Sequence, residues 1–105
     1  MTSMGEADFV AYVGIPDIHD GTILRVSIKG STAEVVIEGY SGCEHSIVFQ
    51  GIRKVEMKEP EGMLLYSLSE MQAEAPFREF VFTSNNEDDD KYLSVTAVDF
   101  RIRSS

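Results

Sequence analysis

The chain has 105 residues, of which 43% are hydrophobic and 26% are charged, as in an ordinary globular protein. A chain of this length can form one hydrophobic core, so we expect a single domain over residues 1–105. Its 18 acidic and 9 basic residues give a net charge of −9, and a field of that sign repels phosphate backbones and anionic lipid. Nucleic acid and membrane surfaces are therefore disfavoured as partners, whereas a basic protein partner is allowed.

The N-terminal sequence MTSMGEADF has neither the basic nor the apolar segment of a signal peptide. Cys43 is the only cysteine, so it cannot form an internal disulfide, and a lone thiol suits a reducing compartment. We therefore expect a cytoplasmic protein.

The first predicted element is a short helix over residues 6–13, in which apolar side chains recur at helical spacing. Ser3 and Glu6 have the spacing of a capping box, and Pro16 prevents the helix from continuing. A loop over residues 17–21 follows.

Three strands come next, over residues 22–29, 33–40 and 45–51, because apolar and polar residues alternate in each. The turns between them, at 30–32 and 41–44, are short, so we expect an antiparallel meander.

The middle of the chain is less regular. Residues 53–58 alternate as a fourth strand, and a turn with proline and glycine follows at 59–62. The apolar run 63–68 predicts a strand that passes into one helical turn at 69–74; a longer helix there would make the protein α+β.

The C-terminal part predicts a long hairpin with arms at 77–83 and 91–103, joined by a polar loop at 84–90. In the second arm the apolar positions change parity between Ala97 and Val98. An inward face cannot switch parity in a regular strand, so we expect a bulge or sharp bend there, which would let the strand contribute to two layers.

We therefore predict a mainly β fold, with six or seven strands in a curved antiparallel sheet or two-layer β-sandwich and a short N-terminal helix. The alternating apolar positions form the predicted core: Leu24, Val26, Ile28, Val35, Ile37, Ile47, Phe49, Val55, Leu65, Phe80, Phe82, Val98 and Phe100.

His19 and Asp20 are the first pair of residues that could carry chemistry, since histidine beside a carboxylate can bind a metal, act as a base or contact a ligand. No metal-ligand spacing accompanies the pair, so we expect no metal or other cofactor. A structural role, with Asp20 capping the turn before the first strand of the meander, is the simpler interpretation.

Cys43 and His45 lie two residues apart, which would put them on one face of a strand. Glu44 lies between them, and its charge opposes formation of the thiolate, so we do not expect a catalytic nucleophile.

The densest charge lies at Glu87, Asp88, Asp89 and Asp90, in the loop of the long hairpin. These carboxylates lack the glycine and the ligand spacing of a calcium loop. With the acidic turn at 59–62 they could form an acidic face for a basic partner, although a solvated hairpin tip would look the same.

The segment 18–68 begins with His19-Asp20-Gly21 and continues with apolar residues at regular spacing: Leu24, Val26, Ile28, Val35, Ile37, Ile47, Phe49, Gly51, Ile52, Val55, Gly62, Leu65 and Tyr66. This order resembles a group of small, mostly uncharacterised bacterial β-rich proteins, in which a strand begins just after His-Asp. Similar sequences occur among immunity proteins that neutralise bacterial toxins. The resemblance implies a β-rich fold and supplies no catalytic residues.

The sequence thus predicts a non-enzymatic protein-interaction domain, in the form of an immunity-like inhibitor with an acidic binding face. A small-molecule or enzymatic module that uses His19, Asp20, Cys43 and His45 is one alternative. Homo-oligomerisation through an exposed strand edge is another.

Overall fold

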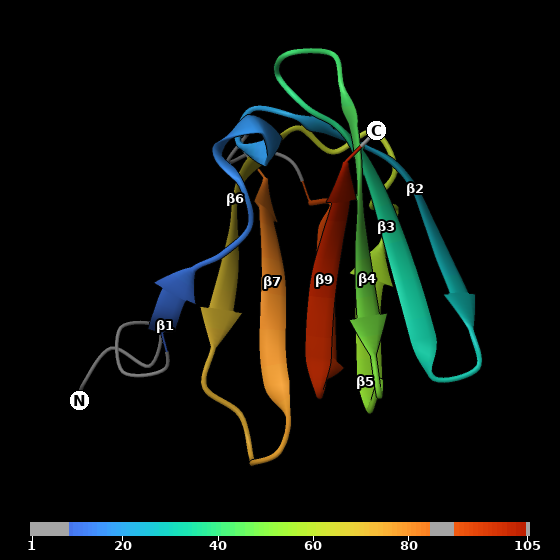
Figure 1. The fold of residues 1–105 in the computed structure, drawn as a ribbon, viewed down its shortest axis with the longest axis vertical. Coiled ribbons are helices and arrows are strands. Elements are labelled where there is room, and N and C mark those ends of the chain that lie inside the picture. Colours follow the sequence, from blue (N-terminus) through green and yellow to red (C-terminus); the bar gives the residue numbers. More distant parts are fainter. Residues whose placement is uncertain (1–8, 85–89, 105) are drawn as a thin grey trace.

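The computed structural model describes residues 9–84 and 90–104. In this part of the chain nine strands form two antiparallel sheets that pack together as a β-sandwich, so the predicted fold class is confirmed (Figure 1). No helix in these residues is long and apolar enough to cross a membrane. The strands are β1 (Phe9–Tyr12), β2 (Thr22–Lys29), β3 (Thr32–Glu38), β4 (Glu44–Gln50), β5 (Lys54–Lys58), β6 (Leu65–Met71), β7 (Arg78–Ser84), β8 (Tyr92–Ala97) and β9 (Asp99–Ser104).

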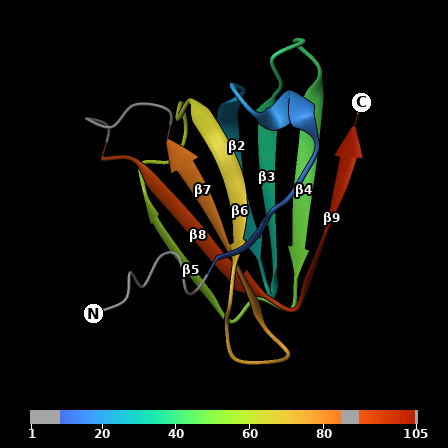
Figure 2. The same ribbon diagram turned by 90° about the vertical axis from the view of Figure 1, so that its left-hand side faces the viewer.

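The two sheets divide the chain in a simple way. One has the order β2-β3-β4-β9 and contains the predicted meander; the other has the order β1-β6-β7-β8-β5 and contains the predicted β7-β8 hairpin. In Figure 2 the strands β5, β8, β7 and β6 of one sheet lie on the left and the strands of the other sheet lie on the right, and the segment between β1 and β2 crosses from one side to the other.

The predicted break in the C-terminal arm is confirmed. β8 pairs with β7 in the five-stranded sheet, and β9 pairs with β4 in the four-stranded sheet. Val98 lies at the bend between them, where its backbone N–H donates to the carbonyl oxygens of Gln50 and Gly51 at 3.0 and 3.2 Å. One run of sequence therefore joins the two layers.

Both predicted helical segments are wrong. Residues 9–12 form the edge strand β1, because their backbone groups pair with β6; residues 1–8 lie outside the described part. β6 continues to Met71 with no helical turn, since it is paired with β7 on one side and β1 on the other. Pairing with a neighbouring strand has overridden local helical spacing in both places.

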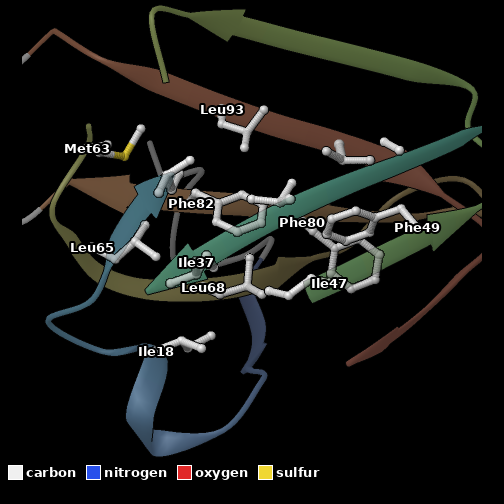
Figure 3. Packing of buried hydrophobic residues seen from close by; sticks show 14 of the residues in the cluster. Ile18, Ile37, Ile47, Phe49, Met63, Leu65, Leu68, Phe80, Phe82 and Leu93 are labelled. Atoms are coloured by element: carbon white, nitrogen blue, oxygen red, sulfur yellow. The ribbon is translucent and has the colours of Figure 1, made fainter. Parts of the chain in front are cut away.

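The core lies between the sheets (Figure 3). Phe49 is fully buried at its centre, with ring centroids 5.2 Å from Phe80 and 6.0 Å from Phe82. Ile18, which comes from the segment between β1 and β2, enters the same cluster. Burial of large apolar side chains from both sheets is what holds the two layers together.

Three predicted core residues are wrong, since Leu24, Ile28 and Val98 are 38%, 47% and 41% exposed. A β-bulge between Ile23 and Arg25 inserts one extra residue, so Ile23 faces the core and Leu24 does not. Ile28 has inward parity but lies near the end of an edge strand, and Val98 occupies the bend. The other ten are buried or pack against the core.

Charged side chains close one end of the sandwich. The Arg78 guanidinium donates to both carboxylate oxygens of Glu70, at 2.8 and 3.0 Å, and lies 5.2 and 5.4 Å from the ring centroids of Phe80 and Phe100. It also reaches Asp99 at 3.4 Å, so a residue of β7 contacts β6 and β9. The guanidinium holds the pKa of the Glu70 carboxyl below its ordinary value.

Candidate functional site

A single-turn 3-10 helix, η1 (Pro16–Ile18), closes the opposite end of the sandwich (Figure 1). Proline suits the first position of such a turn because its φ is already fixed near the helical value. Ile18 anchors the turn by burying its side chain completely in the core. The loop predicted over residues 17–21 therefore includes an ordered turn, and the buried side chain of Ile18 fixes its position.

The backbone conformation explains why aspartate and glycine occupy positions 20 and 21 of the His-Asp-Gly sequence. Asp20 has a φ of 67°, in the left-handed region that aspartate tolerates better than most residues. A Cβ on Gly21 would lie 2.7 Å from the Glu38 carbonyl oxygen, so only glycine fits. Asp20 and Gly21 also exchange backbone hydrogen bonds of 2.8 Å with Leu65, which ties the turn to the other sheet.

Asp17 links the turn to the β3-β4 connection. Its carboxylate accepts hydrogen bonds from the Ser41 backbone N–H at 2.9 Å and from the Ser41 hydroxyl at 2.7 Å, and its backbone carbonyl accepts from Tyr40 N–H at 2.9 Å. A Cβ on Gly39 would overlap this carboxylate, so glycine is required there.

His45 is the buried partner of Asp17. Its Nε2 lies 2.7 Å from Asp17 Oδ2, and its Nδ1 lies 2.7 Å from the Ser104 hydroxyl oxygen. An ionised carboxylate only accepts, so Nε2 carries the proton, and in the neutral ring Nδ1 accepts from Ser104. Donation from His45, and then from Ser41, holds the pKa of the Asp17 carboxyl below its ordinary value.

The structure does not bring the predicted Cys43 and His45 pair onto one face. Cys43 precedes β4 and is exposed, whereas His45 lies in β4 and points between the sheets. The residue that connects the His19-Asp20 neighbourhood with His45 is Asp17, because it bonds His45 and lines a surface hollow with His19 and Asp20.

Two adjoining hollows open beside η1, and both are lined by His19 and Asp20. One, of about 250 Å³, also has Tyr12, Tyr66 and Ser67 in its walls; the other, of about 440 Å³, has Pro16, Asp17 and Tyr40. Tyr12, Tyr40 and Tyr66 are 60%, 80% and 57% exposed. We call Tyr12, Tyr40, Tyr66, His19 and Asp20 the tyrosine face.

A bulge places Tyr66, and a ring contact places Tyr12. The pairing of β6 with β7 slips between Leu65 and Ser67, so Tyr66 is the extra residue of a bulge and its ring turns to solvent. The ring of Tyr12 packs edge to face on Phe9, with centroids 5.0 Å apart. The charged residues that line the hollows are Asp17 and Asp20, so the face is acidic and aromatic.

The structure describes only part of the predicted acidic face. Glu87, Asp88 and Asp89 lie outside the described residues, and Asp90 is exposed with an ion pair of 2.7 Å to Lys58. Lys91 donates to the backbone carbonyls of Glu59 and Glu61, so the end of the hairpin loop at Lys91 adjoins the acidic turn at 59–62.

Asp17 and the three tyrosines are the site residues that sequence reasoning missed. Asp17 lies two residues before His19 and just after a proline, which is a sequence signal for a side chain in a tight turn. The tyrosines come from β1, the β3-β4 turn and β6, and only the fold brings them together. Within residues 9–84 and 90–104, no group of three or more His, Cys, Asp or Glu side chains could hold a metal ion.

Comparisons of the chain with protein-family models, with curated proteins and with solved structures find no match.

Proposed function

We propose that this protein is a non-enzymatic interaction domain that binds a basic protein partner through the tyrosine face. The observation that carries the proposal is the gathering of three of the four tyrosines of the chain around two hollows whose charged residues are both aspartates. Tyrosine supplies a large contact area with little loss of conformational entropy, and it is enriched among the residues that dominate binding energy.

A basic partner fits this face for two reasons. The rings of Tyr12, Tyr40 and Tyr66 offer faces on which a guanidinium or ammonium group can stack, and the carboxylates of Asp17 and Asp20 offer charge of the opposite sign. The net charge of −9 would also speed the approach of such a partner. An immunity-like inhibitor that covers a basic site of a toxin in the cytoplasm is the form of this function that the sequence resemblance suggests.

A small-molecule or enzymatic module is the second candidate, favoured by the hollows beside His19 and Asp20. His45 cannot serve as an accessible base, because its buried ring uses both nitrogens in contacts with Asp17 and Ser104, so the chemistry would have to rely on His19, which lines both hollows. The shallow form of the hollows fits the side chains of a protein partner better than an enclosed substrate.

Binding of a fluorescein-labelled hexaarginine peptide, followed by fluorescence anisotropy, tests the proposal. An exposed cation–π contact contributes about 0.5–1 kcal/mol, so the double variant Tyr12→Ala/Tyr66→Ala should weaken binding by about five- to thirtyfold. Tyr92→Ala is the matched control, because Tyr92 is an exposed tyrosine that lines neither hollow. It should leave the affinity within about twofold.

The four-residue variant Glu87→Gln/Asp88→Asn/Asp89→Asn/Asp90→Asn separates the tyrosine face from the hairpin loop. If that variant abolishes binding while Tyr12→Ala/Tyr66→Ala has no effect, the interface is the acidic loop and the tyrosine face is rejected. Light scattering of the same samples distinguishes partner binding from self-association through a strand edge.

A further inference from the structure

The two hollows of the tyrosine face share a wall, because His19 and Asp20 line both. Tyr12 and Tyr66 line only the smaller hollow, of about 250 Å³, and Tyr40 lines only the larger one, of about 440 Å³. Each hollow thus has its own tyrosine ring beside a carboxylate. One cationic group can occupy only one hollow at a time, so filling both takes two side chains.

The smaller hollow suits a guanidinium group. The rings of Tyr12 and Tyr66 both line it, and a planar guanidinium stacks on tyrosine rings. Asp20 adds a carboxylate, the group with which a guanidinium forms charge-assisted hydrogen bonds. An arginine side chain of the partner is therefore the best match for this hollow.

The larger hollow suits a second cation. Tyr40 offers a ring that is 80% exposed, and Asp17 and Asp20 supply two negative charges. The Asp17 carboxylate already accepts hydrogen bonds from Ser41 and His45, and these bonds lower its pKa and so keep it ionised. Asp17 therefore attracts a cation mainly through its charge.

The charge near the hollows does not offset the two aspartates. Neither hollow has a lysine or arginine among the described residues that line it. Lys58 is paired with Asp90, and Lys91 donates to the carbonyl oxygens of Glu59 and Glu61. On the outer face of the four-stranded sheet, charges of both signs lie together next to this end: Arg25, Arg103, Glu34, Glu38 and Glu44. A cation is therefore the occupant that the charge of the hollows selects.

We propose that the tyrosine face binds a partner segment that carries two neighbouring basic residues, one side chain in each hollow. This inference rests on the proposed function and adds the pattern that the partner must present. Side chains at positions i and i+2 of an extended segment point to the same side, about 7 Å apart, so they can enter two hollows that share a wall. Arginine-x-arginine is therefore the pattern that fits the face.

Competition between peptides tests the pattern. Unlabelled, end-blocked glycine-serine peptides of equal length displace the fluorescein-labelled hexaarginine; one contains Arg-Gly-Arg, one a single arginine, and one two arginines at its opposite ends. The first and third have the same net charge, so only the spacing of the arginines differs. The Arg-Gly-Arg peptide should bind about threefold or more tighter than either of the others, because only it brings two cations together at low entropic cost.

Tyr40→Ala separates the two hollows. This variant should weaken binding of the Arg-Gly-Arg peptide by about two- to fivefold, since it removes the ring of the larger hollow. It should change binding of the single-arginine peptide by less than about 1.5-fold, because that peptide occupies the hollow with two rings. Tyr92→Ala is again the control that should affect neither peptide, and circular dichroism checks that each variant is folded.

Three outcomes would overturn the proposal: equal affinity of the two peptides that carry two arginines, an equal effect of Tyr40→Ala on the Arg-Gly-Arg and single-arginine peptides, or stronger displacement by spermidine than by the Arg-Gly-Arg peptide. If hexaarginine binding still depends on Tyr12 and Tyr66 in these cases, the proposed function stands and only the two-residue pattern fails. If Tyr12→Ala/Tyr66→Ala leaves hexaarginine binding unchanged, the proposed function fails and the pattern fails with it.

Discussion

At the scale of single residues, the turn before β2 shows how backbone geometry explains a sequence that looks catalytic. Asp20 has positive φ, and Gly21 lies against a backbone carbonyl. The sequence correctly places a turn at His19-Asp20, but it does not single out Asp17 as the side chain that ties this turn to the β3-β4 connection. Asp17 makes the polar network with Ser41 and His45.

A first prediction concerns Asp20. Asparagine tolerates positive φ nearly as well as aspartate, so Asp20→Asn should change the free energy of unfolding by less than about 0.5 kcal/mol. A β-branched side chain is strained there, and Asp20→Val should lower the free energy of unfolding by about 1–2 kcal/mol. Urea denaturation measures both, and equal stability of the two variants would show that the backbone conformation does not select the residue.

A second prediction follows from the lowered pKa of Asp17. A carboxyl whose pKa is lower in the folded than in the unfolded state stabilises the fold at neutral pH, and this stabilisation is lost as the pH falls through the folded-state pKa. Asp17→Asn should therefore be less stable than the wild type at pH 7, and the difference in stability should narrow as the pH falls below about 4. Thermal melts from pH 7 to pH 3 test this, and a gap that stays constant with pH would contradict it.

At the scale of elements, the sequence patterns predicted seven strand segments. They correspond to the eight strands β2 to β9, because the last segment is divided into β8 and β9 at the bend that the parity change predicted near Val98. Alternation failed where a strand is irregular. The bulge in β2 exposes Leu24, and no local feature of TILRVSIK shows that Ile23 is the inward residue. β1 was missed because its conformation depends on pairing with β6, which lies more than fifty residues away.

The bulge gives a third prediction, with neighbouring residues as matched variants. Ile23→Ala removes a fully buried side chain and should cost about 2–5 kcal/mol. Leu24→Ala, the change expected to be severe from alternation alone, should cost less than about 1 kcal/mol. If chemical denaturation gives the reverse order, the bulge is misplaced.

The closed ends of the sandwich give a fourth prediction. Arg78→Met leaves Glu70, whose side chain is only 14% exposed, without its cation, and should cost about 1–3 kcal/mol. Arg53→Met is the control, because Arg53 and Glu74 are both more than half exposed and their pair should contribute less than about 1 kcal/mol. Equal effects in urea denaturation would show that the Arg78 contacts do not secure this end.

At the scale of the whole molecule, the fold gathers aromatic surface in a way that the sequence could not show. The strand order and the turn η1 bring three tyrosines together at one end of the sandwich. Residues from three distant segments form the tyrosine face, so their spacing along the chain does not predict that they lie together. The predicted site residues His19 and Asp20 lie within it, whereas the predicted grouping of Cys43 with His45 does not form.

Chemical-shift mapping tests the central claim most directly. Titration of ¹⁵N-labelled protein with the hexaarginine peptide, followed by amide chemical shifts, should perturb Tyr12, His19, Asp20, Tyr40 and Tyr66 most strongly. Shifts confined to Glu59, Glu61 and the hairpin loop 84–90, with the tyrosine face unchanged, would contradict the proposed function.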